Sequence, residues 1–276
     1  MSWRNSVCQQ SGVERVTNLN NYVTRVPISD DSPIDQFYEE TRKIIAFATP
    51  QNIQNFRSLG SLSSVGIVSC CENYFRQVFS SILGICSESQ KNAALQNINM
   101  GSVIWHPNSE IAKGAFEHTS LASSESIFKA SDKYLGIKLK QLGLEAIFKE
   151  FDKICEFRHG IVHSNRVLAG KNGIKLQLTS SEQLTRIEIN FAELQEVLAI
   201  CQAMITSTNS KLFGAMCERW ANSWRNSPSW DINKENEKFK QIWKLFHSNT
   251  DANNGTIADN ISWIKCRNEI KKEYNI

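Results

Sequence analysis

The chain contains the stretch Glu156-Phe157-Arg158-His159-Gly160-Ile161-Val162-His163-Ser164-Asn165. This stretch ends a segment, residues 145–163, whose apolar side chains recur with the period of an amphipathic helix. Arginine binds phosphate oxygens through a permanent charge and a forked set of donors, and histidine exchanges protons near neutral pH. Cleavage of a phosphodiester bond uses both properties. Arg158, His159 and His163 are therefore candidate catalytic residues of a nuclease.

The predicted helix carries a charge on its apolar face. On a helical projection centred on Phe151, the apolar stripe also contains Leu144, Ile147, Phe148, Ile154, Cys155 and Val162. Arg158 falls about 20° from the centre of this stripe. A second predicted helix, residues 63–83, has an acid in the same situation, because Glu72 lies about 40° from Val68 in its stripe. An unpaired buried charge is costly, so we predict that the two helices face each other and that Glu72 pairs with Arg158.

The predicted pair has two interpretations. It is either a structural ion pair or a glutamate that orients an arginine whose remaining donors bind phosphate. His163 lies about 140° from Arg158 but only about 40° from His159 on an ideal helix. Asp152 and Glu156 continue the histidine line, which makes one polar edge.

This polar edge also has more than one interpretation. It is a solvated helix face, a set of three metal ligands that lacks a fourth, or a pair of histidines at a cleft that Arg158 enters. The last interpretation requires a distorted helix, a helix that ends near Gly160, or a second subunit. No ligand spacing recurs in the chain, so we expect neither a metal nor another cofactor.

Bulk properties exclude several classes. The formal net charge of +3 and the pI of about 8.4 are mildly basic and do not by themselves indicate a nucleic-acid-binding protein. No apolar run reaches the roughly 18 residues of a membrane span, and the N-terminus lacks the apolar core of a signal peptide. None of the eight cysteines forms a Cys-x-x-Cys pair, which is typical of a reducing, cytoplasmic environment. The chain also lacks a glycine-rich phosphate loop.

The pattern of the whole chain predicts an all-α protein with a minor β-hairpin. Ser32 and Pro33 mark the start of a helix that ends near Ala48, Gly84 marks the end of the helix at 63–83, and Asn190 with Glu193 forms a capping box. Alternating apolar and polar residues at 174–178 and 185–189 predict the two strands of the hairpin. Further helices are expected near 88–98, 124–134, 135–142, 190–206, 209–225, 234–247 and 257–272, with a loop at 248–255. Five of the seven tryptophans fall in the last seventy residues, where we interpret them as core and, alternatively, as a docking patch or a base-stacking platform.

The sequence resembles the HEPN domain family in the Arg158–His163 run and in the helix at 63–83. The run from Arg158 to His163 resembles the Arg-x(4–6)-His motif of that family, in which a polar residue such as His159 follows the arginine. The phrase FRHGIVHSN and the upstream helix SSVGIVSCCENYFRQVFSSIL are similar to the branch found in bacterial defence and toxin systems, whose first core helix carries an acid at the place of Glu72. The resemblance covers roughly 33–207. It divides the chain into an irregular arm (1–31), a HEPN-like helical domain (32–207) with an insertion at about 85–142, and a tryptophan-rich helical extension (208–276).

The resemblance implies a helical bundle that dimerises, so that two motifs meet in one composite site. It also implies a metal-independent endoribonuclease that leaves 2′,3′-cyclic phosphate and 5′-hydroxyl ends. In this interpretation Arg158 binds phosphate, His163 transfers protons, His159 assists, and Glu72, Glu156 and Asn165 support the site. A defence or toxin role implies a restraint, such as an antitoxin, a sensor or the insertion itself. Two alternatives stay open: a non-catalytic HEPN binding or dimerisation module in a larger defence assembly, and an interaction protein that works through its tail.

Overall fold

The computed structural model describes residue 7, residues 17–228 and residues 230–276. The chain divides into two compact units, residues 1–30 and residues 31–276. In the first unit, the described part contains one 3-10 turn, η2 (Leu19–Asn21), whose first residues are capped by the side chain of Asn18. Residues 1–6 and 8–16 of the predicted arm at 1–31 lie outside the described residues, and its described part contains no other helix and no strand.

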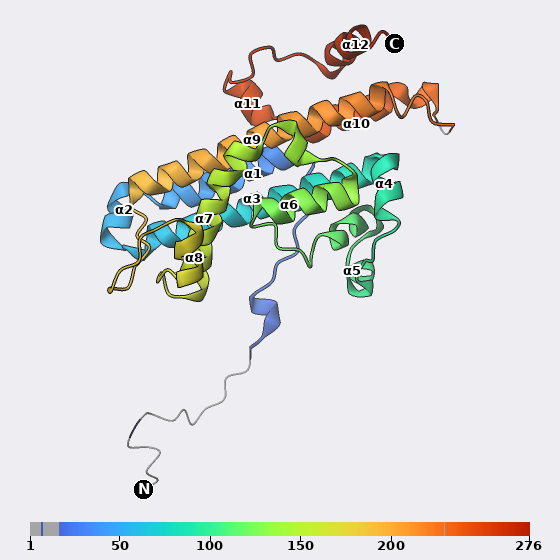
Figure 1. Cartoon of the computed structure of the whole chain (residues 1–276). Helices are drawn as coiled ribbons and strands as arrows, with labels where there is room; N and C mark the ends of the chain where they lie inside the picture. The colour runs from blue at the N-terminus through green and yellow to red at the C-terminus, as the bar shows by residue number, and fades with distance from the viewer. Residues whose placement is uncertain (1–6, 8–16, 229) are drawn as a thin grey trace. The chain divides into compact units, whose positions relative to one another are not determined.

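The second unit is a bundle of helices around α3 (Ser58–Ile85). Helices α1 (Pro33–Phe47), α7 (Glu145–His163) and α9 (Phe191–Ala221) all pack against α3, and α10 (Glu235–Phe246) packs against α9 (Figure 1). Shorter helices complete the unit: α2 (Pro50–Asn55), α4 (Ser87–Ala93), α5 (Met100–Trp105), α6 (Ser124–Ala130), α8 (Gly170–Lys175), α11 (Asn249–Asn253) and α12 (Trp263–Glu273). The predicted all-α class is therefore confirmed.

Aromatic side chains join the helices of the core. Phe75 of α3 contacts Phe148 of α7, with ring centroids 6.1 Å apart, and Phe148 in turn contacts Phe151. Phe79, one turn after Phe75, contacts Phe116 from the segment between α5 and α6. All five rings are fully buried. Because rings at helical spacing face the same way, α3 and α7 are held with their apolar faces together, and this places Glu72 and Arg158 at the edge of one interface.

The predicted starts of two helices are confirmed. The Ser32 side chain accepts a hydrogen bond from the Asp35 amide, with Pro33 at the first helical position. Asn190 and Glu193 form the reciprocal capping box that begins α9. Helix α7 has the bounds that its periodicity predicts, whereas α3 is longer at both ends, since Gly84 lies inside it.

The predicted hairpin is wrong. Residues 170–175 form α8, and the described part of the chain contains no β-strand beyond an isolated antiparallel bridge between Val167 and Arg186. The second predicted strand is extended, with Ile187 and Ile189 buried, but it pairs with the segment just after α7. Of the first predicted strand, residues 174 and 175 belong to α8 and residues 176 and 177 form a turn. Asn172 and Lys175 of α8, three residues apart, lie on one helix face, where both bind Glu156.

The C-terminal region continues the bundle. Helix α9 is one continuous helix that crosses residues 207 and 208, so the expected limit of the HEPN-like domain falls inside a helix. Trp220 and Trp224 are buried, and the ring of Trp220 packs on Phe239 of α10, which confirms their interpretation as core. The segment 248–255, predicted as a loop, contains the short helix α11.

The segment predicted as an insertion, 85–142, contains α4, α5 and α6, the 3-10 helices η3 (Asn108–Ala115) and η5 (Leu139–Leu142), and the π-helix η4 (Ser131–Leu135). Arg219 of α9 holds this segment to the bundle. Its guanidinium donates to the carbonyls of Leu135 and Gly136, at 2.9 and 3.1 Å, and to the hydroxyl of Ser89 at 3.0 Å.

Candidate functional site

Helices α3 and α7 bring Glu72 and Arg158 together, as their positions on the apolar stripes predict. Oε2 of Glu72 lies 4.0 Å from Nη2 of Arg158, and the side chains are 9% and 26% exposed. This distance is too long for a hydrogen bond, so the pair interacts through charge. The predicted pairing is confirmed as an ion pair between two partly desolvated groups.

The other carboxylate oxygen of Glu72 holds a loop. Oε1 accepts hydrogen bonds from the amide of Leu121 at 2.9 Å and from the hydroxyl of Ser120 at 3.3 Å. Arg76, one turn along α3, lies 3.4 Å from the same oxygen and also donates to the carbonyl of Thr119. Glu72 therefore fixes the segment before α6 with one oxygen and faces Arg158 with the other.

Arg158 borders a pocket of about 310 Å³. Within the described chain its guanidinium makes no hydrogen bond, and its Nε is buried without a partner. The pocket is lined by the segment before α6, by one face of α7 and by α8, with Ser120, Ser123, Cys155, His159, Lys171 and Lys175 among its residues. An arginine with five unused donors at the wall of a pocket is a site for an anion.

Two carboxylates of α7 hold the walls of this pocket. Asp152 accepts hydrogen bonds from the amide and the hydroxyl of Ser124, at 2.7 and 2.5 Å, and thereby fixes the start of α6. Glu156 accepts from Asn172 and lies 2.5 Å from Nζ of Lys175, which fixes α8. This hydrogen bond raises the pKa of Lys175, so its ammonium group is charged at neutral pH.

The two histidines of the motif lie side by side at the end of α7. Their ring centroids are 4.7 Å apart, and both side chains are exposed. His159 lines the pocket with Arg158, whereas His163 is absent from the lining residues of that pocket. The structure thus places Arg158, His159 and Glu156 around one pocket, whereas Glu72 contacts Arg158 from outside the lining and His163 lies next to His159. Asn165 follows the helix with a φ of 48° and is exposed.

The thiol in the pocket is inert. Burial raises the pKa of Cys155, and the nearby thiol of Cys201 raises it further, so the group stays protonated at neutral pH. A protonated thiol is a poor nucleophile. Because Cys155 is protonated and the carboxylates of Asp152 and Glu156 are held in hydrogen bonds, histidine is the residue type of this pocket that suits acid–base chemistry near neutral pH.

Sequence reasoning missed part of this site. Lys171, Lys175 and Asn172 reach the pocket because α8 folds back on α7, and Ser120 and Ser123 reach it because Glu72 holds their loop. None of these residues lies in a motif. The alternation at 174–178, which suggests a strand, hid the helical spacing that would have indicated them.

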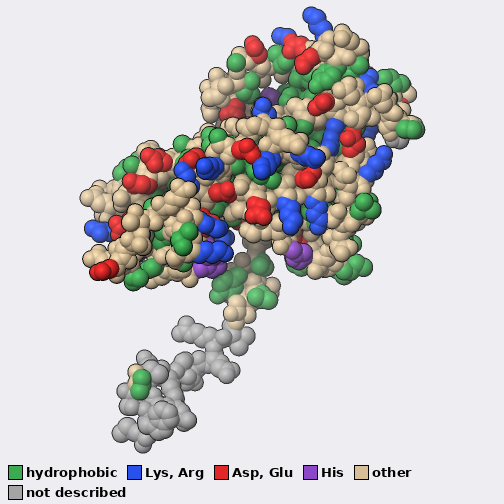
Figure 2. Space-filling model, in the orientation of Figure 1, with side chains coloured by type: hydrophobic (Ala, Val, Ile, Leu, Met, Phe, Trp, Pro, Cys, Tyr) green, Lys and Arg blue, Asp and Glu red, His purple; other side chains and the backbone are tan. Residues whose placement is uncertain are grey.

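The face of the molecule that Figure 2 shows carries no single sign of charge. Figure 2 shows Lys and Arg side chains mixed with Asp and Glu over the visible face. Among the residues that the structure describes, no three His, Cys, Asp or Glu side chains gather at a distance suited to one metal ion. No helix in the described ranges has the length and apolar character that crossing a membrane requires.

Comparison of the chain with models of protein families, with curated proteins and with solved structures gave no match.

Proposed function

We propose that the chain is a HEPN-type endoribonuclease that cleaves RNA without a metal ion. The guanidinium of Arg158 carries this proposal, because it borders a pocket with Glu72 at 4.0 Å and makes no hydrogen bond within the described chain. Two lysines and His159 line the same pocket. The two lysines offset the carboxylates of Asp152 and Glu156 in the same lining, so the unused donors of the arginine suit a phosphate group.

The chemistry uses the nucleophile that RNA carries. One neutral histidine takes the proton of the 2′-hydroxyl, and the 2′-oxygen attacks the neighbouring phosphorus. The bond from phosphorus to the 5′-oxygen breaks, and a protonated histidine gives its proton to that leaving oxygen. The products are a 2′,3′-cyclic phosphate and a 5′-hydroxyl. Arg158 stabilises the charge that develops on the phosphorane, and His163 and His159 are the proton carriers.

The position of His163 supports a composite site in a homodimer. His163 lies outside the lining of the Arg158 pocket, and the neighbouring Val162 is 47% exposed although it belongs to the apolar stripe of α7. Ile174 of α8 is also exposed. A second copy that covers these apolar side chains brings its own α7 end to this face, where its His163 completes the site beside Arg158.

The same observation favours a second candidate function. A domain whose histidine stands apart from its arginine can bind RNA, or dimerise in a larger assembly, without cleaving. The two functions differ in one readout, since only the nuclease produces cyclic phosphate ends. With either function, we place the protein in the cytoplasm. The seven described cysteines are all free, and thiols stay reduced there.

We propose that the protein acts in bacterial defence or as a toxin, because its motif resembles those of defence and toxin proteins. A ribonuclease with such a role needs a restraint, and we propose that an antitoxin or a sensor partner provides it. The segment 85–142 is suited to transmit such a signal, because its residue Leu121 is bound directly by Glu72, the partner of Arg158.

The test compares the wild type with Arg158→Ala and His163→Ala on end-labelled single-stranded RNA in excess EDTA. We expect both variants to lose cleavage, and only Arg158→Ala to lose affinity for the RNA as well. Arg186→Ala and His118→Ala remove an exposed arginine and an exposed histidine outside the motif and serve as matched controls. Cleavage that persists in His163→Ala would show that the assignment is wrong. RNA binding without cleavage by the folded wild type favours the binding module.

A further inference from the structure

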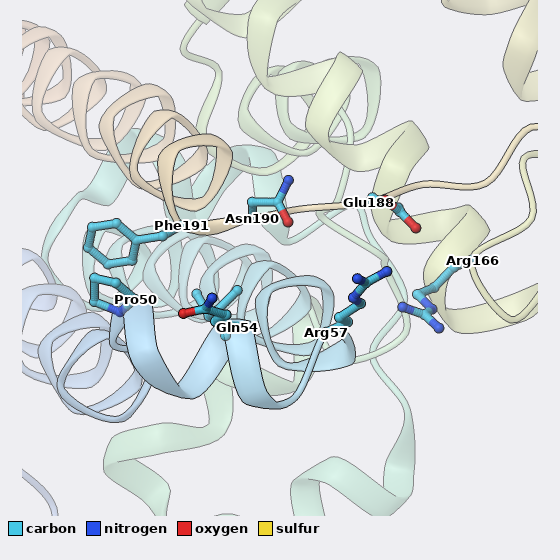
Figure 3. A pocket seen from close by; sticks show the side chains of 8 residues that line it. Pro50, Gln54, Arg57, Arg166, Glu188, Asn190 and Phe191 are labelled. Atoms are coloured by element: carbon cyan, nitrogen blue, oxygen red, sulfur yellow. The ribbon is translucent and has the colours of Figure 1, made fainter.

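A second pocket lies beyond the C-terminal end of α7 and is separate from the one that Arg158 borders. It has a volume of about 430 Å³, and its lining includes Pro50, Gln54 and Arg57 from the region of α2 and α3, and Arg166, Glu188 and Phe191 from the region after α7. Figure 3 shows that the side chains of Arg57 and Arg166 point toward one another at one end of this pocket. The ring of Phe191 lies at the other end, next to Pro50.

The two guanidinium groups have no protein acceptor. Within the described residues neither Arg57 nor Arg166 forms a hydrogen bond or an ion pair through its side chain. Glu188 also lines the pocket but lies beyond ion-pair distance of both arginines. Two like charges that face each other repel, and an anion between them removes that repulsion. Forked donors of this kind fit the oxygens of a phosphate group.

The backbone fixes Arg166 in this position. Its amide donates to the carbonyl of Gly160 at 3.1 Å, and its carbonyl accepts from the amide of Ile187 at 2.8 Å. Its φ of 67° follows the φ of 48° at Asn165, so two consecutive residues that are not glycine adopt the left-handed conformation. The chain thus turns sharply after the motif and directs Arg166 into the pocket.

The opposite end of the pocket suits a base. Phe191 is half-buried and leaves part of its ring in the pocket, and the side-chain amides of Gln54 and Asn190 lie between it and the arginines (Figure 3). Aromatic faces accept any nucleobase by stacking, and amides pair with base edges. The volume is within the usual range for a small-molecule site.

We infer that this pocket binds one nucleotide, with its phosphate between Arg57 and Arg166 and its base against Phe191. Because Arg166 follows His163 by three residues, the nucleotide is a unit of the RNA strand that flanks the cleaved bond. That the nucleotide belongs to an RNA strand rests on the proposed function. A free mononucleotide has the same phosphate and base and would make the same contacts. Binding to the pocket itself does not depend on cleavage.

The test measures binding of two probes by calorimetry: a 2′-O-methyl oligoribonucleotide, which cannot be cleaved by 2′-hydroxyl attack, and 5′-AMP. We expect Arg57→Gln and Arg166→Gln each to weaken oligonucleotide binding roughly tenfold or more, as for charged hydrogen bonds. Arg186→Gln removes the same charge from the neighbouring exposed segment and is expected to change binding by less than about threefold. Phe191→Leu keeps the apolar volume, removes the flat ring, and is expected to weaken binding as well.

The probes separate the sources of the nucleotide. If Arg57→Gln and Arg166→Gln weaken binding of the oligonucleotide alone, the nucleotide is part of the RNA strand. If 5′-AMP binds the wild type and both variants lose it, the pocket takes a free nucleotide. If both variants bind both probes as Arg186→Gln does, with unchanged melting temperatures, the inference is overturned. A wild type that binds but never cleaves overturns the ribonuclease proposal and leaves this inference intact.

Discussion

Oε2 of Glu72 lies 4.0 Å from Nη2 of Arg158, while Oε1 of the same carboxylate accepts a hydrogen bond from the amide of Leu121. One acidic side chain therefore joins Arg158 to the segment 85–142. Its two oxygens have separate tasks, since one faces Arg158 and the other holds the segment through Leu121.

Removing the charge of Glu72 tests the first task. Glu72→Gln keeps an oxygen for the Leu121 amide but no longer attracts Arg158, so the guanidinium loses its orientation. We expect a folded protein whose RNA cleavage falls by roughly tenfold, the usual scale for groups that orient another. Rates are measured beside Glu182→Gln, the same change on an exposed loop. Full activity in folded Glu72→Gln would reduce the pair to a structural one.

The contacts of Arg219 with the segment 85–142 are expected to stabilise it. Arg219→Ala removes one donor from the carbonyl of Leu135, which keeps its hydrogen bond from the Ser89 hydroxyl, and removes the arginine's hydrogen bonds to the Gly136 carbonyl and to Ser89. We expect faster amide hydrogen exchange in this segment and a loss of stability of about 1–3 kcal/mol. Lys211→Ala, an exposed change on the same helix, is the control. Exchange that speeds up equally in both variants would contradict the anchoring role.

Asp35 is expected to make the stability of the folded chain depend on pH. It accepts hydrogen bonds from Ser248 and from the amides of Asn249 and Thr250. Burial opposes its ionisation, but these hydrogen bonds outweigh burial and hold the pKa of Asp35 below its usual value of 3.8. A lowered folded pKa means that the unfolded chain takes up the proton first, so this stability is present above about pH 4 and is lost as pH falls through the folded pKa.

Asp35→Asn therefore tests the linkage. We expect it to unfold more easily than the wild type at pH 7, by about 1–3 kcal/mol, and we expect this difference to shrink at pH 3. The measurement is denaturant unfolding at both values, with the exposed Asp132→Asn as the control. A difference that stays constant with pH would show that the carboxylate of Asp35 is not the acid-sensitive group.

Two glycines of α3 provide a matched pair. A Cβ at Gly60 would lie 1.9 Å from the carbonyl oxygen of Ile189, whereas a Cβ at Gly84 meets nothing within 4 Å. We expect Gly60→Ala to destabilise the protein by about 1–3 kcal/mol, because backbone must move. Gly84→Ala should stabilise it by about 0.5–1 kcal/mol through helix propensity. The two melting temperatures should move in opposite directions, and equal shifts would contradict the close approach of α3 to residue 189.

The sequence predicts the parts of the site that depend on helical periodicity. A charge on an apolar stripe needs a partner, and this rule predicts the pair of Glu72 and Arg158 from helical periodicity alone. The rule does not reach residues that a loop or a short helix supplies. Lys171 and Lys175 enter the pocket through the contact of Glu156 with α8, and that contact depends on tertiary packing. The same packing makes residues 170–175 helical.

The pocket of Arg57 and Arg166 was also beyond sequence reasoning. Its two arginines are far apart in the chain, and the left-handed turn at Asn165 and Arg166 involves residues that seldom adopt it. A glycine there would have suggested the turn. The continuous helix α9 likewise gives no sign in composition that residues 207 and 208 lie inside it.

The central claim is that this site cleaves RNA by means of the 2′-hydroxyl and without a metal. Its most direct test uses one RNA oligonucleotide, and the same oligonucleotide with a single 2′-deoxynucleotide on the 5′ side of the cleaved bond, both in excess EDTA. We predict that the wild type cleaves the first to 2′,3′-cyclic phosphate and 5′-hydroxyl ends and leaves the second intact. Cleavage of the deoxy-substituted strand at that bond, or activity that EDTA abolishes, would contradict the account.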